Sequence, residues 1–300
     1  MTRVAPTTVY SEHARRAQRA QLAYLQRQGR YAMGSGDYID FGNRTDFDGV
    51  AAAWWAVCFE YRGTPNKALA GRPASVAAEQ QWYTRINGSA QLYARVATDL
   101  AGNGGGVVGS TTLQADGTLY WYLVLYDGSG AGNADRLRLL LRTKPPGGRW
   151  SAWADDAGSY VGAAIPATLV TPTLSANLRL GRFDNGDDPE SIFEDFRWGT
   201  TLPTREQRSV MSLDAAPEAD HWYPLRIDAD DAVGAYDGTV TGAELQTRYA
   251  VVTDAALEDA AFATAAGDGR LYIKDSAVSG SILAYTGEAR RLSIISAPTA

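Results

Sequence analysis

The chain has 300 residues and a formal net charge of −6, with 31 glycines, eight tryptophans and sixteen tyrosines. This length suits one large domain or two, and many glycines with many aromatic residues are typical of strands joined by tight turns. No run of about 18 apolar residues occurs, so we expect no membrane insertion. The first residues lack the apolar stretch of a secretory signal. The single cysteine, Cys58, excludes an intrachain disulfide, and we expect it to be a small buried hydrophobic residue.

The first 30 residues form a basic segment ahead of an acidic body. Six arginines against Glu12 alone give this segment a charge of +5, which leaves −11 for residues 31–300. Between an N-cap at Ser11 and a stop at Gly29, residues 12–28 contain neither glycine nor proline, and this favours a helix. Its apolar stripe is narrow, so the helix must lie on another protein, on a copy of itself or on its own sandwich. We predict an arm that anchors the chain on a partner, with a self-docked or solvated helix as the alternative. Nucleic acid is a poor partner because the acidic body repels phosphate. The anchoring residues that we predict are Arg15, Arg16, Arg19, Tyr24 and Leu25.

Several segments predict the strands of a β-sheet. Residues 50–61 are aromatic and become β-branched toward their end, as a central strand requires. Asn87-Gly88 stands between the strand-like segments 81–86 and 90–96, which is typical of a tight hairpin. Residues 119–126 are apolar on both faces, so we expect both faces to be covered.

Two further patterns predict one more strand and a short helix. Residues 136–142 alternate arginine and leucine, which predicts a strand with one buried face and one wet, cationic face. Further along the chain, Thr204 and Gln207 have the spacing of a capping box, with Pro203 just before the cap. This spacing predicts a short helix over residues 202–211.

Four motifs then follow one another along the chain, namely Tyr31–Gly42, Leu178–Phe183, Ser191–Gly199 and the helix-forming Leu202–Met211. In this order and at this separation they resemble the laminin-G-like, concanavalin A-like family. The resemblance implies an all-β fold, an antiparallel jelly-roll β-sandwich of two sheets over residues 31–213. Members of this family usually bind sugars or protein surfaces and only sometimes catalyse. Because a fold does not identify a ligand, function has to be argued from the chemistry of a site.

Residues 214–300 leave two arrangements open. Ala219–Arg226 and Asp230–Gly242 look like the opening of another laminin-G-like unit, but too little chain remains for a second sandwich. Short strand-like segments follow at 249–253, 270–274, 281–285 and 291–295. We expect either a small β-rich C-terminal subdomain or strands that extend the main sandwich.

The sequence gives little support for catalysis. No serine-nucleophile, zinc-binding or phosphate-loop motif occurs, and His13 and His221 stand apart from any cysteine or serine motif. Glycosidases with this fold often place carboxylates at alternate positions of one strand. Glu194 and Asp195 are instead adjacent, so we expect them to point to opposite faces of a strand, and Glu190 is four positions from Glu194. We therefore predict that the chain is not an enzyme.

An acidic turn is the candidate metal site. Calcium binds six to eight oxygen atoms, and the family resemblance implies calcium at the rim of the sandwich. The alternative is an ordinary solvated turn, and the patch of Asp228, Asp230 and Asp231 has a lesser claim. The predicted ligands of calcium, the one cofactor that we consider, are Asp184, Asn185, Asp187 and Asp188.

A group of aromatic residues is the candidate sugar site. Sugar binding needs exposed rings for stacking and polar groups for the hydroxyls. Trp150 and Trp153 flank a loop rich in proline and glycine at 145–148, and Tyr160 lies nearby in the sequence. We predict that these three aromatic residues bind a glycan. The alternative is that they fold over the edge of the sandwich as additional core. The acidic body favours a neutral glycan over an anionic one.

Two functions from different classes follow. In the first, the chain is a non-enzymatic structural or adhesive component of a bacteriophage particle, such as a capsid decoration, a head fibre or a tail protein. It would then be made in the host cytoplasm, anchored by its arm to other virion proteins, assembled as a homo-oligomer such as a trimer, and exposed on the particle surface. In the second, it is an exported polysaccharide-binding protein or a glycoside hydrolase of concanavalin A-like fold.

Overall fold

The computed structural model describes residues 29–34, 36–72, 81–99, 103–173, 177–183, 191–213, 216–225, 229–247, 249–253, 271–275 and 284–285. Two compact units divide the chain, one of residues 31–245 and the other of residues 1–30 with 246–300. The predicted helix over 12–28 and its anchoring residues lie outside the described residues. Within those residues, no helix is long and apolar enough to cross a membrane.

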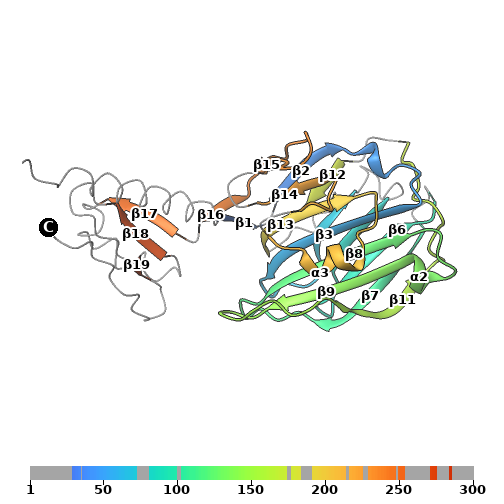
Figure 1. The fold of residues 1–300 in the computed structure, drawn as a ribbon, viewed down its shortest axis with the longest axis horizontal. Helices are drawn as coiled ribbons and strands as arrows, with labels where there is room; N and C mark the ends of the chain where they lie inside the picture. Colours follow the sequence, from blue (N-terminus) through green and yellow to red (C-terminus); the bar gives the residue numbers. More distant parts are fainter. Residues whose placement is uncertain are drawn as a thin grey trace, which may run out of the picture. The chain divides into compact units, whose positions relative to one another are not determined.

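The larger unit contains two sheets (Figure 1). In the first sheet the strands run in the order β10 (Ala154–Asp155), β9 (Leu137–Lys144), β8 (Leu119–Asp127), β3 (Ala52–Tyr61), β13 (Ser191–Gly199), β1 (Gly29–Met33) and β16 (Glu244–Thr247), with β14 (His221–Tyr223) added on β13. β3 lies between β8 and β13 and is antiparallel to both. β1 pairs with the first residues of β13, and β14 pairs with its last residues.

The second sheet is antiparallel throughout. Its order is β11 (Ala157–Gly162), β7 (Gly104–Thr112), β6 (Gln91–Ala97), β5 (Trp82–Ile86), β4 (Lys67–Arg72), β12 (Asn177–Leu180), β2 (Tyr38–Asn43) and β15 (Thr239–Thr241). Short helices join the strands, namely η1 (Thr45–Phe47), α2 (Asn133–Arg136) and α3 (Arg205–Val210). The described part of the larger unit is therefore an antiparallel β-sandwich of the jelly-roll class, as the family resemblance predicts.

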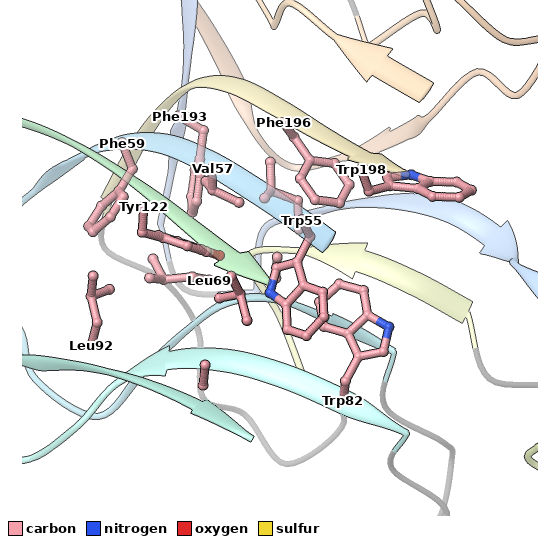
Figure 2. Close-up of a cluster of buried hydrophobic side chains, with 14 of the residues drawn as sticks. Trp55, Val57, Phe59, Leu69, Trp82, Leu92, Tyr122, Phe193, Phe196 and Trp198 are labelled. Carbon is pink, nitrogen blue, oxygen red and sulfur yellow. The ribbon is translucent and has the colours of Figure 1, made fainter. Parts of the chain in front are cut away.

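The core between the sheets follows from alternation along β3. Trp55, Val57 and Phe59 point into the sandwich and are fully buried (Figure 2). Trp55 stacks on Trp82 of the opposite sheet with ring centroids 4.1 Å apart, and its indole N–H donates to Thr84 over 2.8 Å. The hydrogen bond gives the buried Trp55 indole a partner, whereas the Trp82 indole nitrogen is buried without one among the described residues, so stacking and burial rather than hydrogen bonding hold Trp82 in this pair.

A second apolar layer covers the outer face of the first sheet. Trp121, Leu123 and Leu125 of β8 point outward and are buried under the segment that includes Met211 and Ala219. The alternate side chains of β8, those of Tyr120, Tyr122, Val124 and Tyr126, face the main core. The prediction that both faces of this strand are covered is confirmed.

Local predictions are also confirmed. β5 and β6 form the predicted hairpin, in which the Asn87 side chain accepts hydrogen bonds from the backbone N–H groups of Ser89 and Gln91. Thr204 and Gln207 form the predicted capping box at the start of α3, although the helix spans only Arg205–Val210. Cys58 is a free, buried thiol on the outer side of β3.

Strands beyond residue 213 also pair with the sandwich: β14 pairs with β13, and β15 pairs with β2. The smaller unit contains β17 (Tyr249–Thr253), β18 (Leu271–Asp275) and β19 (Ala284–Tyr285) as a separate sheet. β17 and β18 are parallel, and β19 is antiparallel to β18.

Candidate functional site

A pocket of about 510 Å³ opens at the edge of the second sheet, where β15 lies against β2. The loop that precedes β15 forms its other wall. Polar and aromatic side chains line the pocket together, which is the composition expected of a small-ligand site. The lining residues are Tyr38, Asp40, Phe41, Gly42, Arg44, Ala235, Tyr236, Asp237, Thr239 and Thr241. We call it the Arg44 pocket.

Arg44 is the unusual residue of this pocket. Its guanidinium carbon lies 3.5 Å from the centroid of the Tyr236 ring, a cation–π contact. Its Nε and Nη1 atoms are buried and have no hydrogen-bond partner among the described residues. A buried donor without a partner costs stability, so it marks a position where a ligand can supply the missing acceptor. The Tyr236 ring that covers these atoms is itself 46% exposed.

The pocket contains two carboxylates with different surroundings. Asp40 accepts hydrogen bonds from the backbone N–H of Gly42 at 2.8 Å and from the Asn177 amide at 3.0 Å. It also pairs with Arg179, whose Nε lies 3.1 Å away. Asp237 accepts a hydrogen bond from the backbone N–H of Asp231. Asp40 is therefore held in place as part of the wall.

Asp231 shapes the loop that carries Tyr236. Its Oδ1 accepts hydrogen bonds from the backbone N–H groups of Trp222, Val233 and Gly234 at 2.9 to 3.2 Å, and its Oδ2 is paired with His221. Burial acts to raise the pKa of Asp231, but the Gly234 N–H, His221 and the other donors outweigh it and hold the pKa below its usual value. The sequence placed Asp231 in an acidic patch, whereas in the structure its carboxylate holds the loop that carries Tyr236.

Two glycines allow β2 and the loop before β15, the walls of the Arg44 pocket, to approach each other closely. Gly42 has a φ of +74°, which disfavours any residue with a side chain. A Cβ at Gly238 would lie 2.7 Å from side-chain carbons of Ile39 and Phe41, so the loop before β15 packs on β2 only because residue 238 is glycine.

The structure brings together two of the three predicted glycan-binding aromatic residues. Trp150 and Trp153 each lie 5.7 Å from Trp121, measured between ring centroids, and are partly buried on the outer face of the first sheet. The Trp153 indole N–H donates to the backbone oxygen of Arg208 and so ties α3 to this layer. Tyr160 lies on β11 of the other sheet, packs against the main core and donates to the backbone oxygen of Leu137. Trp150, Trp153 and Tyr160 therefore do not form a single cluster.

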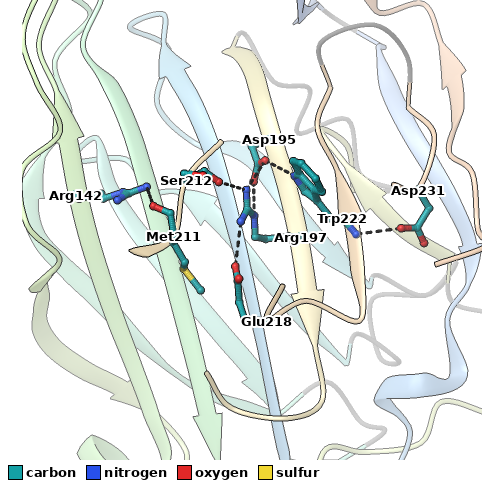
Figure 3. Close-up of polar contacts among 8 residues, drawn as sticks. All are labelled: Arg142, Asp195, Arg197, Met211, Ser212, Glu218, Trp222 and Asp231. Atoms are coloured by element: carbon teal, nitrogen blue, oxygen red, sulfur yellow. Dashed lines mark hydrogen bonds and ion pairs between the residues drawn. The ribbon is translucent and has the colours of Figure 1, made fainter. Parts of the chain in front are cut away.

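A buried ionic network lies beside these tryptophans (Figure 3). Arg197 donates from Nε and Nη2 to both oxygens of Asp195, each over 2.8 Å, and from Nη1 to Glu218 over 3.0 Å. A further hydrogen bond joins Arg197 to the backbone oxygen of Ser212, and the Trp222 indole N–H donates to Asp195. The network holds the segment around Glu218 on the outer face of β13.

The expected opposite orientation of Glu194 and Asp195 depends on a regular strand, and β13 is irregular at this point. A β-bulge between Phe193 and Asp195 shifts the register of β13 against β3 and places Asp195 opposite Cys58. Burial first, then the charges of Glu194 and Asp195, raise the pKa of the Cys58 thiol well above its usual value. A bulge cannot be recognised from alternation alone, because alternation is the pattern that it breaks.

The predicted calcium ligands Asp184, Asn185, Asp187 and Asp188 lie outside the described residues, as does Glu190. Among the residues that the structure describes, no group of three or more histidine, cysteine, aspartate or glutamate side chains is placed to hold a metal ion.

No family model matches the chain, and no curated protein matches it. Solved structures do share its fold. A putative carbohydrate-binding protein from Bacteroides ovatus aligns with a TM-score of 0.50 and 13% identity over 73% of this chain. The alignment spans 60% of that protein's length. A heptameric SAP-like pentraxin from Limulus polyphemus gives a TM-score of 0.45, 8% identity, and coverage of 74% of this chain and 96% of the pentraxin. The enzymatically active domain of a tailspike protein from bacteriophage CBA120 gives 0.38, 10% identity, and coverage of 57% and 25%. At 13% identity the likeness to the Bacteroides ovatus protein concerns the fold alone.

Proposed function

We propose that this chain is a non-catalytic carbohydrate-binding module and that the Arg44 pocket holds one residue of a neutral glycan. The observation that carries the proposal is the Arg44 guanidinium beside the exposed Tyr236 ring, since two of its nitrogen atoms are buried and have no partner among the residues that the structure describes. A sugar hydroxyl offers the oxygen acceptor that these N–H groups lack, and it does so without bringing a negative charge into the pocket.

The other lining residues fit a sugar ring. Tyr236 and Tyr38 present aromatic surface for stacking, and Thr239 and Thr241 add hydroxyl groups that both donate and accept. Asp237 adds an acceptor. A small displacement of the Tyr236 side chain would expose the Arg44 donors to a ring that enters the pocket.

Hydrolysis is the alternative, since two carboxylates line the pocket. A glycosidase needs both carboxyl groups available to the scissile bond. Asp40 is already engaged by Gly42, Asn177 and Arg179. That leaves Asp237 without a second available carboxyl group among the residues that line this pocket, and it favours binding over catalysis.

A glycan array of neutral polysaccharides, followed by calorimetric titration of the best ligand, tests the proposal. Tyr236→Ala should weaken binding about tenfold through the lost stacking surface, and Arg44→Gln should weaken it by a similar factor. Val233→Ala is the matched control, because Val233 is 49% exposed in the same loop and does not line the pocket.

Two results would overturn the proposal. One is an array without a hit, and the other is full affinity in a natively folded Tyr236→Ala chain. Release of reducing ends that disappears with Asp237→Asn would identify the chain as a hydrolase instead.

We further propose, from the sequence, that a bacteriophage particle displays this module through the basic segment 1–30. The charge of +5 on that segment, against −11 on the rest, supports an electrostatic anchor. Coexpression with particle proteins tests it: a chain of residues 31–300 should fold but no longer sediment with assembled particles. Normal incorporation of the shortened chain would remove the anchoring role.

A further inference from the structure

A second pocket, of about 380 Å³, lies on the outer face of the first sheet. Its walls are β9, the segment 151–155 and α3. None of its lining residues is shared with the Arg44 pocket. They are Arg138, Leu140, Arg142, Ser151, Ala152, Trp153, Asp155, Arg205, Arg208 and Ser209. We call it the arginine pocket.

This pocket is strongly cationic although the whole chain is acidic. Four of its lining residues are arginines and Asp155 is the single carboxylate among them. Arg138 lies 3.4 Å from Asp155, but both side chains are largely exposed, so this pair gives little neutralisation. The pKa of Arg208 is lowered by burial and then by the nearby charges of Arg138 and Arg205. The guanidinium groups therefore repel one another across the pocket.

Arg142 forms the buried end of the pocket. Its side chain is 7% exposed, and its guanidinium carbon lies 3.9 Å from the Trp121 ring centroid, 4.7 Å from that of Trp153 and 4.9 Å from that of Trp150. Nη2 donates to the backbone oxygen of Met211, while Nε has no hydrogen-bond partner in the described part of the chain. The predicted wet, cationic face of this strand is thus wrong at Arg142. A cation surrounded by indole rings attracts an anion more strongly than one in water, because the local dielectric is low.

We propose that the arginine pocket binds the carboxylate of an acidic sugar, a uronate residue. Guanidinium groups match a carboxylate in two parallel hydrogen bonds. The volume suits one sugar ring, Trp153 offers aromatic surface, and Ser151 and Ser209 offer hydroxyl groups. This site is independent of the neutral-glycan function proposed for the Arg44 pocket, and it gives Trp153 a place in glycan binding.

Calorimetric titration of the full chain with digalacturonate, and with its uncharged dimethyl ester, tests the proposal. The two probes have the same rings and differ in charge. We expect the free acid to bind at least about tenfold more tightly than the ester, and its affinity to fall when salt is raised. Arg205→Gln and Arg138→Gln change exposed side chains, so they should leave the fold intact and weaken binding of the acid about tenfold each. Arg44→Gln should leave it unchanged.

Several outcomes would overturn the proposal. Equal affinity for acid and ester would show that charge is not recognised. Full affinity in natively folded Arg205→Gln and Arg138→Gln chains would place the ligand elsewhere. Inorganic sulfate binding as tightly as digalacturonate would reduce the pocket to an adventitious ion only. Loss of acid binding with Arg44→Gln would assign the ligand to the other pocket.

Discussion

Replacing Arg197 by methionine should destabilise the sandwich more than almost any other change of a polar residue. Arg197 is fully buried with Asp195, and Glu218 is nearly so. The pKa of Arg197 is raised, because the charges and hydrogen bonds of Asp195 and Glu218 outweigh burial, which acts to lower it. Methionine fills much of the same volume but leaves two buried carboxylates without their cation.

The magnitude follows from that arrangement. Removing one partner of a buried ionic network costs about 3–5 kcal/mol, since the remaining charge stays uncompensated. Here one guanidinium serves both carboxylates, so we expect about 4 kcal/mol or more at pH 7. The orphaned carboxylates take up protons in the folded variant at a higher pH than in the unfolded chain. Its deficit against the wild type should therefore shrink as pH falls toward 5.

Urea unfolding followed by tryptophan fluorescence at pH 7 and pH 5 measures both effects. Arg138→Met is the matched control, because Arg138 pairs with Asp155 at the surface and its loss should cost less than about 1 kcal/mol. The triple change Asp195→Asn, Arg197→Met, Glu218→Gln should recover part of the loss. A deficit below about 1 kcal/mol, or one of equal size at both pH values, would refute the reasoning.

Three further predictions concern single groups. Asp231 has a lowered pKa in the folded chain, so its contribution to stability is present above its ordinary pKa of 3.8 and is lost as pH falls through its pKa in the folded state. The stability of Asp231→Asn, measured by acid unfolding, should therefore depend less steeply on pH in that range. Cys58, buried with a raised pKa, should react with a thiol reagent at pH 8 only after urea unfolds the chain, and rapid labelling of native protein would contradict its burial. Thr204→Ala removes the side-chain half of the capping box with Gln207 and should lower the free energy of unfolding by about 1 kcal/mol. Thr204→Ser keeps the hydroxyl and should cost little, so equal losses in the two variants would exclude the cap.

Features set by neighbouring residues were predictable from the sequence. The aromatic and β-branched residues of 50–61 identify a central strand, and the continuous apolar run of 119–126 identifies a strand covered on both faces. Asn87-Gly88 identifies a hairpin, and the spacing of Thr204 and Gln207 identifies a cap. Each of these signals acts over a few positions, where side-chain direction follows from backbone geometry. The order of the longer motifs also indicated the jelly-roll sandwich.

Both pockets depended on tertiary structure. Arg44 meets Tyr236 because β15 pairs with β2 across nearly two hundred positions of chain, and no local pattern specifies that partner. The acidic net charge pointed toward neutral ligands, yet folding gathers arginines from β9 and α3 around one cavity. A bulge in β13 interrupts the alternation expected at Glu194 and Asp195 and places Asp195 opposite Cys58. The sequence determines which side chains each strand presents, while strand pairing and register determine which of them share a site, because those depend on contacts between distant segments.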